Sequence, residues 1–254
     1  MEKHDFKDRK IWLTGASSGI GYELACLLIQ AGAKIVVSAR TEEKLNQLVQ
    51  LSPGSVKSIP FDVKQFEQYP LICQQVIQAY DGLDIIILNA GNCKYIDVKN
   101  FQADTVNEMM QVNFMSMVHA IEQTLPCLRK SKYAHIVAVS SSAAFLGLPR
   151  AEAYGTSKAA IKYFFESLRA DLDHQKVAVS LVFPGFVKTP LTDKNNFPMP
   201  LIISAEKAAK VIYQGIQQYK QEIKMPWIFI RLIKFIAILP VTLRTKIVAK
   251  MAKK

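Results

Sequence analysis

The sequence carries a phenol and an ammonium group that are spaced for proton transfer. Tyr154 and Lys158 lie four residues apart in the stretch Tyr-Gly-Thr-Ser-Lys, a spacing that puts two side chains on one face of a helix. An unperturbed phenol titrates near pH ~10, but a neighbouring cation and hydrogen bonds to the anion lower its pKa. A tyrosine tuned in this way can exchange a proton with a substrate oxygen. The ordinary alternative is an exposed helical pair, because this spacing also occurs by chance.

A glycine-rich segment near the start of the chain is typical of a phosphate-binding turn. Residues 14–21 read Thr-Gly-Ala-Ser-Ser-Gly-Ile-Gly and directly follow a short apolar run. Glycines let the backbone approach a pyrophosphate, and the N–H groups at a helix start stabilise its charge. Such a turn alone also serves tight turns and helix packing. Its place between a predicted strand and a predicted helix favours a dinucleotide site.

The residues after the second predicted strand indicate which dinucleotide is bound. That strand ends in Ser-Ala-Arg-Thr, at residues 38–41. An acid at this point accepts a hydrogen bond from the ribose 2′-hydroxyl, whereas a cation pairs with a 2′-phosphate. Because no acid stands in this stretch and Arg40 can form a bidentate contact, we predict NADP(H) in preference to NAD(H). The alternative is that Arg40 is a solvated residue at a helix start.

Short apolar runs alternate with amphipathic stretches, and this order predicts the scaffold for these groups. We expect strands at residues 10–14, 34–38, 58–60, 85–88, 135–140 and 178–182, and helices at 20–31, 41–51, 104–125 and 153–174. Strands that are apolar throughout are buried on both faces of a parallel sheet, and helices supply its crossovers. The sequence therefore predicts an α/β fold with a doubly wound parallel sheet, the Rossmann arrangement. After Pro184 we expect only loops and helices, which cover one side of the nucleotide site.

Length and composition fit one domain with a C-terminal extension. The chain has 254 residues, of which 50% are hydrophobic and 21% charged, which is a globular composition with enough apolar material for a buried sheet. We assign residues 1–190 to a dinucleotide-binding and catalytic core. Residues 191–225 are assigned to a substrate-side loop and helix, and residues 226–254 to a basic amphipathic tail.

The cysteines and the first residues bear on the compartment. Four cysteines stand far apart, without a CxxC pair, at positions 26, 73, 93 and 127, so neither a zinc site nor a redox dithiol is predicted. The first ten residues are polar and of mixed charge, unlike a signal peptide. We therefore expect reduced thiols, no metal and a cytoplasmic protein.

The positive charge is concentrated at the C-terminal end. Of the net charge of +11, the stretch 219–254 holds nine Lys and Arg residues and one acid, which leaves +3 for the rest. Basic patches in RNA-binding modules are interleaved with stacking aromatic residues, and that pattern is not found here. We do not expect nucleic acid as a partner.

Together these motifs resemble the short-chain dehydrogenase/reductase family over roughly residues 10–189. The glycine spacing GxxxGxG after Thr14 is similar to that of the family, as is Ser141, which ends an Ile-Val-x-x-Ser-Ser stretch thirteen residues before Tyr154. The resemblance implies that Ser141 orients and polarises a substrate carbonyl and that Tyr154 donates the proton in reduction. It also implies that Lys158 tunes Tyr154 and holds the nicotinamide ribose, while Asn113 positions a water that returns the proton.

The resemblance also implies a set of cofactor contacts. Asp62 and Val63 would contact adenine, residues 89–91 would support the central sheet, and Val187 and Thr189 would hold the nicotinamide carboxamide. A second cation that marks NADP-binding members, just before the middle glycine, is replaced by Ser18 here. The predicted cofactor-binding residues are Thr14, Gly15, Ser17, Ser18, Gly19, Ile20, Gly21, Arg40, Asp62, Val63, Asn89, Ala90, Gly91, Tyr154, Lys158, Pro184, Gly185, Val187 and Thr189.

The activity implied by the resemblance is hydride transfer between a nicotinamide and a ketone or secondary alcohol, in a homodimer or homotetramer. The apolar tail favours an apolar or lipid-like substrate. A rival hypothesis is a non-catalytic NADP-binding regulatory or scaffold protein on the same fold, against which the intact set Asn113, Ser141, Tyr154 and Lys158 argues. A third, nucleotide-sugar epimerase or dehydratase chemistry, usually comes with a longer chain and a TGxxGxxG turn.

The C-terminal tail combines apolar and basic residues. Residues 227–239 are almost wholly apolar apart from Arg231 and Lys234, which we place on one face, and this stretch is too short to span a bilayer. The next stretch predicts a basic amphipathic helix, which is typical of contact with an anionic membrane surface. Removing residues 226–254 would then spare the nucleotide site. The alternative is that the same apolar face packs on another subunit or covers the substrate cleft. In the predicted helix, the apolar residues at helical spacing are Leu243, Ile247, Val248 and Met251.

Overall fold

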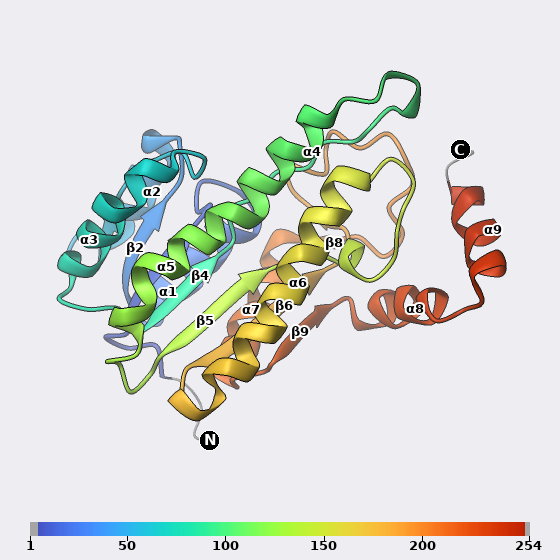
Figure 1. The fold of residues 1–254 in the computed structure, drawn as a ribbon. Coiled ribbons are helices and arrows are strands. Elements are labelled where there is room, and N and C mark those ends of the chain that lie inside the picture. The colour runs from blue at the N-terminus through green and yellow to red at the C-terminus, as the bar shows by residue number, and fades with distance from the viewer. Residues whose placement is uncertain (1–4, 252–254) are drawn as a thin grey trace.

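A seven-stranded parallel sheet forms the centre of the structure, a computed structural model that describes residues 5–251 (Figure 1). The strand order is β3-β2-β1-β4-β5-β6-β9, with every neighbouring pair parallel. The doubly wound parallel sheet predicted from the sequence is confirmed. Lys253 and Lys254 of the predicted tail lie outside the described residues. The strands are β1 (Lys10–Thr14), β2 (Lys34–Ser38), β3 (Val56–Ser58), β4 (Ile85–Leu88), β5 (His135–Val139), β6 (Ala178–Pro184) and β9 (Glu222–Met225).

Most strands lie where the apolar runs predict them, and β3 is displaced. β1, β2 and β4 have the predicted bounds, whereas β3 ends at Ser58 instead of beginning there. Beyond Ser58, the amides of Ile59 and Phe61 still donate to carbonyls of the chain at β2, over 3.0 and 3.1 Å. Pro60 lies between them and has no N–H group for a ladder. The regular strand therefore precedes the proline.

One strand of the sheet was not predicted. β9 pairs with β6 in the register Leu181 to Glu222 and Phe183 to Lys224, so the prediction of only loops and helices after Pro184 was wrong. The side chains of β9 alternate between half-buried and buried, as is typical of an edge strand. This alternation explains why a search for continuous apolar runs misses it. A small second sheet pairs β7 (Val187–Lys188) with β8 (Ile203–Ser204).

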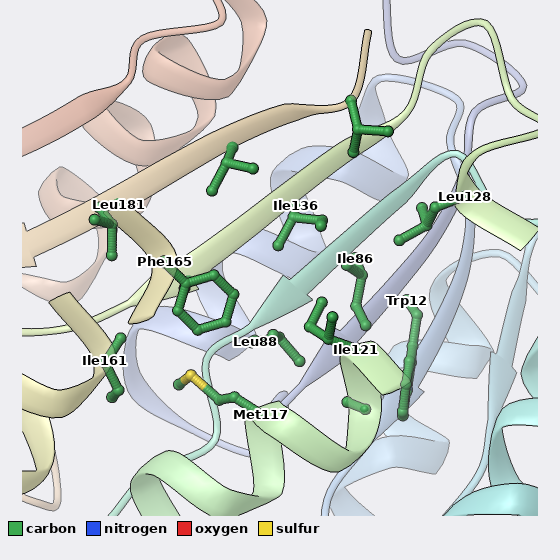
Figure 2. Packing of buried hydrophobic residues seen from close by; sticks show 14 of the residues in the cluster. Trp12, Ile86, Leu88, Met117, Ile121, Leu128, Ile136, Ile161, Phe165 and Leu181 are labelled. Carbon is green, nitrogen blue, oxygen red and sulfur yellow. The ribbon is translucent and has the colours of Figure 1, made fainter. Parts of the chain in front are cut away.

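Helices cover both faces of the sheet, and alternate side chains of each strand serve the two layers. Trp12, Ile86 and Ile136 pack with residues of α3 (Tyr69–Ala79), α5 (Ser116–Leu128) and α6 (Glu152–Leu172), as Figure 2 shows for α5 and α6. The residue after each of these three turns to the opposite face, because side chains alternate along a strand. There they meet α1 (Gly19–Gln30), α2 (Glu42–Leu51) and α7 (Ala205–Gln217).

The long helix predicted for residues 104–125 is interrupted. The structure has α4 (Ala103–Met110), a π-helical turn at Gln111–Met115, and then α5. A π-helical turn inserts an extra residue into an α-helix and is often found at functional sites. Asn113, in the middle of this turn, is completely buried.

The topology places a crevice at the carboxyl ends of β1 and β4. The chain moves outward from β1 to β2 and β3 and then returns to β4 beside β1, which is the switch point where ligands bind in open parallel sheets. After β9, α8 (Trp227–Ala237) and α9 (Val241–Met251) lie beyond one edge of the sheet (Figure 1). Within residues 5–251, no helix is both long and apolar enough to cross a bilayer.

Candidate active site

A cavity of about 430 Å³ opens at the carboxyl ends of the strands, and all but two of the predicted residues line it. Two of them, Thr14 and Asn113, are instead buried in the protein, at 4% and 0% exposure. The predicted residues that line the cavity are Gly15, Ser17, Ser18, Gly19, Ile20, Gly21, Arg40, Asp62, Val63, Asn89, Ala90, Gly91, Ser141, Tyr154, Lys158, Pro184, Gly185, Val187 and Thr189.

The glycine turn is shaped by close backbone packing. Gly15 and Gly19 have φ values of +72° and +56°, which residues other than glycine rarely adopt. A Cβ at Gly15 would lie 2.8 Å from the Cα of Ala90, and one at Gly19 would lie 2.8 Å from Cγ2 of Thr189. A Cβ at Gly21 would collide with the carbonyl of Gly15. The turn thus forms a cradle at the start of α1, whose dipole favours an anion there.

Thr14 and Asn89 tie the glycine turn to the end of β4. The hydroxyl of Thr14 accepts hydrogen bonds from the amides of Asn89 and Ala90, both over 3.1 Å. The side-chain amide of Asn89 donates to the carbonyls of Thr14 and Gly15, over 3.2 and 3.1 Å. These four bonds give Thr14 and Asn89 a supporting role, in which they hold the two walls of the crevice in register.

The end of the cavity where adenosine is predicted to bind, here called the adenosine end, is formed by the residues after β2 and β3. Arg40 is exposed and lines the cavity together with Ala39 and Thr41. Asp62 lines the same cavity and accepts a hydrogen bond from the amide of Lys64 over 3.0 Å. That bond fixes the turn at Asp62 and Val63 but leaves carboxylate lone pairs for a ligand.

Asn113 connects the segment after β4 to helix α6. Its carbonyl oxygen accepts from the amide of Asn92 over 2.8 Å, and its amide donates to the carbonyl of Asn92 over 3.0 Å. The same amide donates to the hydroxyl of Ser157 over 2.9 Å, and that hydroxyl donates to the carbonyl of Tyr154. A Cβ at Gly91 would lie 3.2 Å from Asn113 Oδ1 and 3.5 Å from Lys158 Nζ. Asn113 is therefore close to the ammonium group.

Tyr154 and Ser141 face one another at one end of the cavity, which we call the reacting end because the predicted catalytic side chains lie there. Ser141 follows β5, and its hydroxyl accepts from the amide of Ala143 over 3.2 Å. Burial, followed by the nearby thiol of Cys93, raises the pKa of Tyr154, and a hydrogen bond with Ser141 opposes that rise. This direction is opposite to the lowered pKa that the spacing of Tyr154 and Lys158 predicts. Burial of the phenol outweighs the effect of its partners, so Tyr154 is protonated at neutral pH.

Lys158 is held beneath Tyr154 by the main chain. Its ammonium group donates to the carbonyl of Val139 over 3.0 Å and lies 5.7 Å from the centre of the Tyr154 ring. Burial lowers the pKa of Lys158 to about 8, against an opposing effect of Cys93. The hydroxyl of Ser140 donates to the carbonyl of Lys158 over 2.8 Å, so Ser140 positions helix α6. Lys158 remains largely charged at neutral pH.

The loop after β6 forms the wall beside the reacting end. The amide of Gly185 donates to the carbonyl of Met225 over 2.7 Å, which joins this loop to β9. Thr189 is anchored by Thr192, whose hydroxyl accepts from the Thr189 amide over 3.0 Å and donates to the carbonyl of Val187 over 2.7 Å. Val187 and Thr189 therefore hold fixed positions at the cavity.

Several residues at the site carried no sequence signal. Asn92, the hydrogen-bond partner of Asn113, directly follows the predicted residues 89–91. Its role could be recognised only from the π-helical turn that holds Asn113. Cys93 and Tyr95 lie close enough to Tyr154 to affect pKa values there. Thr192 and Lys194 line the cavity from the region after Pro184. None of these belongs to a recognisable motif.

The apolar segment of the tail is divided between two environments. Phe229, Ile230, Ile233 and Ile236 of α8 join the main hydrophobic core, and a Cβ at Gly185 would lie 2.7 Å from the Phe229 ring. Deletion of residues 226–254 would remove this packing from the loop that lines the cavity, and the expectation that it spares the nucleotide site stays a prediction. A variant of this region must preserve the buried face of α8.

The two cations of α8, predicted to lie on one face, have different partners. Arg231 lies over the exposed ring of Trp227 at 4.7 Å. Lys234 instead lies 3.6 Å from the carboxylate of Glu222 and 4.3 Å from the centre of the Phe145 ring. Arg231 thus faces solvent, whereas Lys234 forms an ion pair with Glu222 of β9.

A sequence model described as short chain dehydrogenase matches residues 9–199, three quarters of the chain. The chain belongs to this oxidoreductase family. A protein of Myxococcus xanthus described as an uncharacterized oxidoreductase is 33% identical over 222 residues, covering 86% of this chain and 88% of its own. The protein 11-beta-hydroxysteroid dehydrogenase-like 3 of Arabidopsis thaliana is 35% identical over 234 residues, which cover 87% of this chain and 75% of that protein.

Solved structures share the fold of this short chain dehydrogenase. A family member from Burkholderia phymatum in complex with NAD superposes with a TM-score of 0.82 at 22% identity, covering 91% of this chain and 93% of that one. A short-chain dehydrogenase from Streptomyces avermitilis has a TM-score of 0.80 at 21% identity, covering 90% and 92%. The Rossmann arrangement in one domain is therefore confirmed.

Proposed function

We propose that this protein is an NADP(H)-dependent oxidoreductase that transfers a hydride between nicotinamide and a ketone or secondary alcohol. The observation that carries the proposal is that Ser141, Tyr154 and Lys158 line the same cavity as the glycine turn. The turn fits a dinucleotide, because Gly15 and Gly19 leave a cradle at the positive end of α1 that side chains would distort.

The residues at the reacting end suit proton transfer to a carbonyl oxygen. A bound reduced nicotinamide would supply the hydride to the carbonyl carbon. Ser141 donates a hydrogen bond to the carbonyl oxygen, and Tyr154 transfers its proton to the same oxygen as negative charge develops there. The ammonium of Lys158 then stabilises the tyrosinate. Asn113, close to Lys158, positions water that returns the proton.

A screen of ketones and secondary alcohols tests the proposal. Turnover is followed through the absorbance of reduced nicotinamide with NADPH or NADP⁺, and we expect turnover of apolar ketones. The rival function is a non-catalytic NADP-binding protein, which would bind the cofactor and turn over none of these compounds. The complete set of reacting groups argues against that rival.

The surroundings of the reacting end support an apolar substrate. Phe186 contacts the rings of Phe197 and Phe229, with centres 6.1 and 5.4 Å apart. Tyr95 packs edge-on against Phe197 at 5.6 Å. Phe186 belongs to the loop whose residues Gly185 and Val187 line the cavity, and aromatic surroundings are typical of sites for apolar molecules, so we propose an apolar, lipid-like ketone as substrate. We also propose a homodimer or homotetramer formed through the long helices α5 and α6.

The choice of cofactor gives a testable prediction. The native protein should bind NADPH more tightly than NADH, because Arg40 is exposed at the adenosine end and can pair with a 2′-phosphate. Arg40→Ala should reduce that preference by about 10-fold or more, as expected for the loss of a hydrogen bond between charged groups. Arg129→Ala, at an exposed arginine that ends α5, serves as the control. Titration that finds NADH bound more tightly by the native protein would refute the NADP(H) preference.

We further propose that the exposed side of α8 and α9 contacts an anionic membrane surface. Five large apolar side chains are 52–79% exposed along and after α8: Trp227, Ile228, Leu232, Phe235 and Ile238. Arg231, Lys246 and Lys250 are exposed among or near them, and residues 223–254 contain no acid. Each such cation near an anionic surface contributes on the order of 1 kcal/mol, and apolar insertion adds to it. This charge distribution favours lipid as the occupant of the face.

Vesicle binding tests this surface without disturbing the core. The native protein should sediment with anionic vesicles at low salt, less so at high salt, and weakly with neutral ones. Trp227 is 57% exposed and the only other tryptophan, Trp12, is buried, so a blue shift of emission should report insertion of α8. The variant Leu232→Ser with Phe235→Ser should lose most binding, whereas Leu71→Ser, at an exposed leucine of α3, should not.

Two outcomes would count against the membrane surface. Native protein that stays in solution with anionic vesicles at low salt would show that lipid is not the partner. If the double variant then also lowered the mass of the native oligomer, a second copy of the chain would be the occupant of this face.

A further inference from the structure

A group of side chains joins the region after β7 to the segment after β4. The hydroxyl of Tyr95 donates to Oδ1 of Asn195 over 2.9 Å, and its ring packs edge-on against Phe197. Arg150 lies over the same ring at 5.3 Å and donates to Oδ1 of Asn196 over 3.1 Å. We call this group, Tyr95, Arg150, Asn195, Asn196 and Phe197, the Tyr95 clasp.

The two sides of the clasp differ in how firmly they are held. On one side, Asn92 is bound to Asn113, and the amide of Ile96 donates to the carbonyl of Arg150 over 2.9 Å. On the other side, residues 195–199 contain one further side-chain bond, from Asn195 to the sulfur of Met199 over 3.4 Å. This second segment is also held by the amide of Asn195, which donates to the carbonyl of Thr192 over 3.0 Å, and by Phe197, which contacts Phe186. The clasp joins it to the segment after β4.

The clasp lies between two cavities. Lys194 lines the cavity that holds Tyr154 and Ser141. Asn196, two residues later, lines a separate cavity of about 430 Å³ together with Tyr95, Ile96, Asp97, Val98 and Arg150. Asn195 stands between them in the chain, bonded to Tyr95. The bond thus joins a segment that lines the second cavity to the residue between Lys194 and Asn196, which line the two cavities.

Tyr95 also lies close to the reacting groups. Burial raises its pKa, and the nearby Cys93 and Tyr154 raise it further, while Arg150 opposes them. The second cavity has an apolar lining from Ile96 and Val98 and polar groups at its rim from Asp97, Arg150 and Asn196. Such a space suits the apolar, distal part of a ketone whose carbonyl lies at Tyr154.

We infer that Tyr95 is a specificity-determining residue whose hydrogen bond to Asn195 closes the passage to the second cavity, so that ketones too large for the first cavity must open the clasp to react. This inference rests on the proposed function, because it concerns the substrate of the same site. When only the open form binds a ligand, the apparent affinity falls by the fraction that is open. Weakening the clasp therefore favours large ketones and leaves small ones unaffected.

Two variants remove the same hydrogen bond from its two sides. Tyr95→Phe keeps the ring against Phe197 and Arg150, and Asn195→Ala removes the acceptor. Each should raise the ratio of kcat/KM for 4-phenylcyclohexanone to that for cyclohexanone by about fivefold, the change expected for the loss of one neutral hydrogen bond. The double variant should give no further rise, because both substitutions break one bond. Tyr163→Phe, at a tyrosine 77% exposed on α6, should leave the ratio unchanged.

Limited proteolysis measures clasp opening independently of turnover. Lys194 is exposed and adjoins Asn195, and cleavage by trypsin after it tracks the open population when opening is fast. With NADPH held constant, Tyr95→Phe and Asn195→Ala should each speed this cleavage about fivefold, as read from the new N-terminus at residue 195. Native rates of cleavage in both variants would show that no clasp exists.

Two further outcomes would decide whether Tyr95 determines substrate specificity. Faster cleavage with an unchanged ketone ratio would overturn the specificity role of Tyr95. If the native protein reduced no ketone at all, the proposed function and the specificity role would fall together, while the cleavage rates would still show whether Tyr95 holds residues 195–199 in place.

Discussion

Tyr154→Phe is expected to abolish turnover while leaving the fold and NADPH affinity intact. The substitution removes only the hydroxyl that faces Ser141, and the ring stays between Cys93 and Lys158. A positioned proton donor contributes ~10²–10⁴-fold to a rate, so kcat should fall by about that factor. Steady-state kinetics, with NADPH affinity from titration and stability from thermal unfolding, provide the measurement.

The matched control for Tyr154→Phe is Tyr163→Phe, which makes the same chemical change at an exposed position of the same helix. The control should keep native kcat. If Tyr154→Phe retained more than a few per cent of native activity, Tyr154 would not be the acid and base of the reaction.

Lys158→Ala should damage cofactor binding and rate together. The ammonium group is buried below Tyr154 and close to Asn113, where it is assigned both the nicotinamide ribose and the tyrosinate. We expect weaker NADPH binding and a lower kcat, with the two effects separated by titration and by kinetics at saturating cofactor. Lys162→Ala, one turn later and paired with Glu166 over 2.6 Å, is the control. Unchanged NADPH affinity would remove the ribose role.

The pH dependence of reduction provides a second readout for Lys158. Burial lowers its pKa to about 8, so the ammonium group is present below that pH and is lost as pH rises through it. Ketone reduction by the native protein should therefore decline above pH 8. The residual activity of Lys158→Ala should lack this decline, whereas Lys162→Ala should keep it.

The central fold could be predicted from the sequence because its signals are local. β1, β2 and β4 are continuous apolar runs, and a parallel sheet buries such runs on both faces. The glycine turn and the pair Tyr154 and Lys158 are short motifs whose chemistry depends on close spacing. The structure places the lining residues of both motifs at one cavity, as two ends of one dinucleotide site would require.

What the sequence could not predict depends on distant contacts. β9 alternates in burial, so its place in the sheet depends on β6 as a neighbour. The π-helical turn at Asn113 is a main-chain arrangement without a sequence pattern. Tyr95 and Asn195 are bonded across a separation of 100 residues. α8 is apolar on nearly all sides, and only its packing against Gly185 reveals which side is buried.

Transfer of deuterium from the cofactor to a ketone tests the proposed activity most directly. Native protein is incubated with an apolar ketone and NADPH that carries deuterium on both faces of its nicotinamide C4, and the alcohol is analysed by mass spectrometry. We expect one deuterium on the carbinol carbon of the product with the native protein and almost no product with Tyr154→Phe. Native protein that binds this NADPH but forms no deuterated alcohol from any ketone of the screen would contradict the assignment as an oxidoreductase.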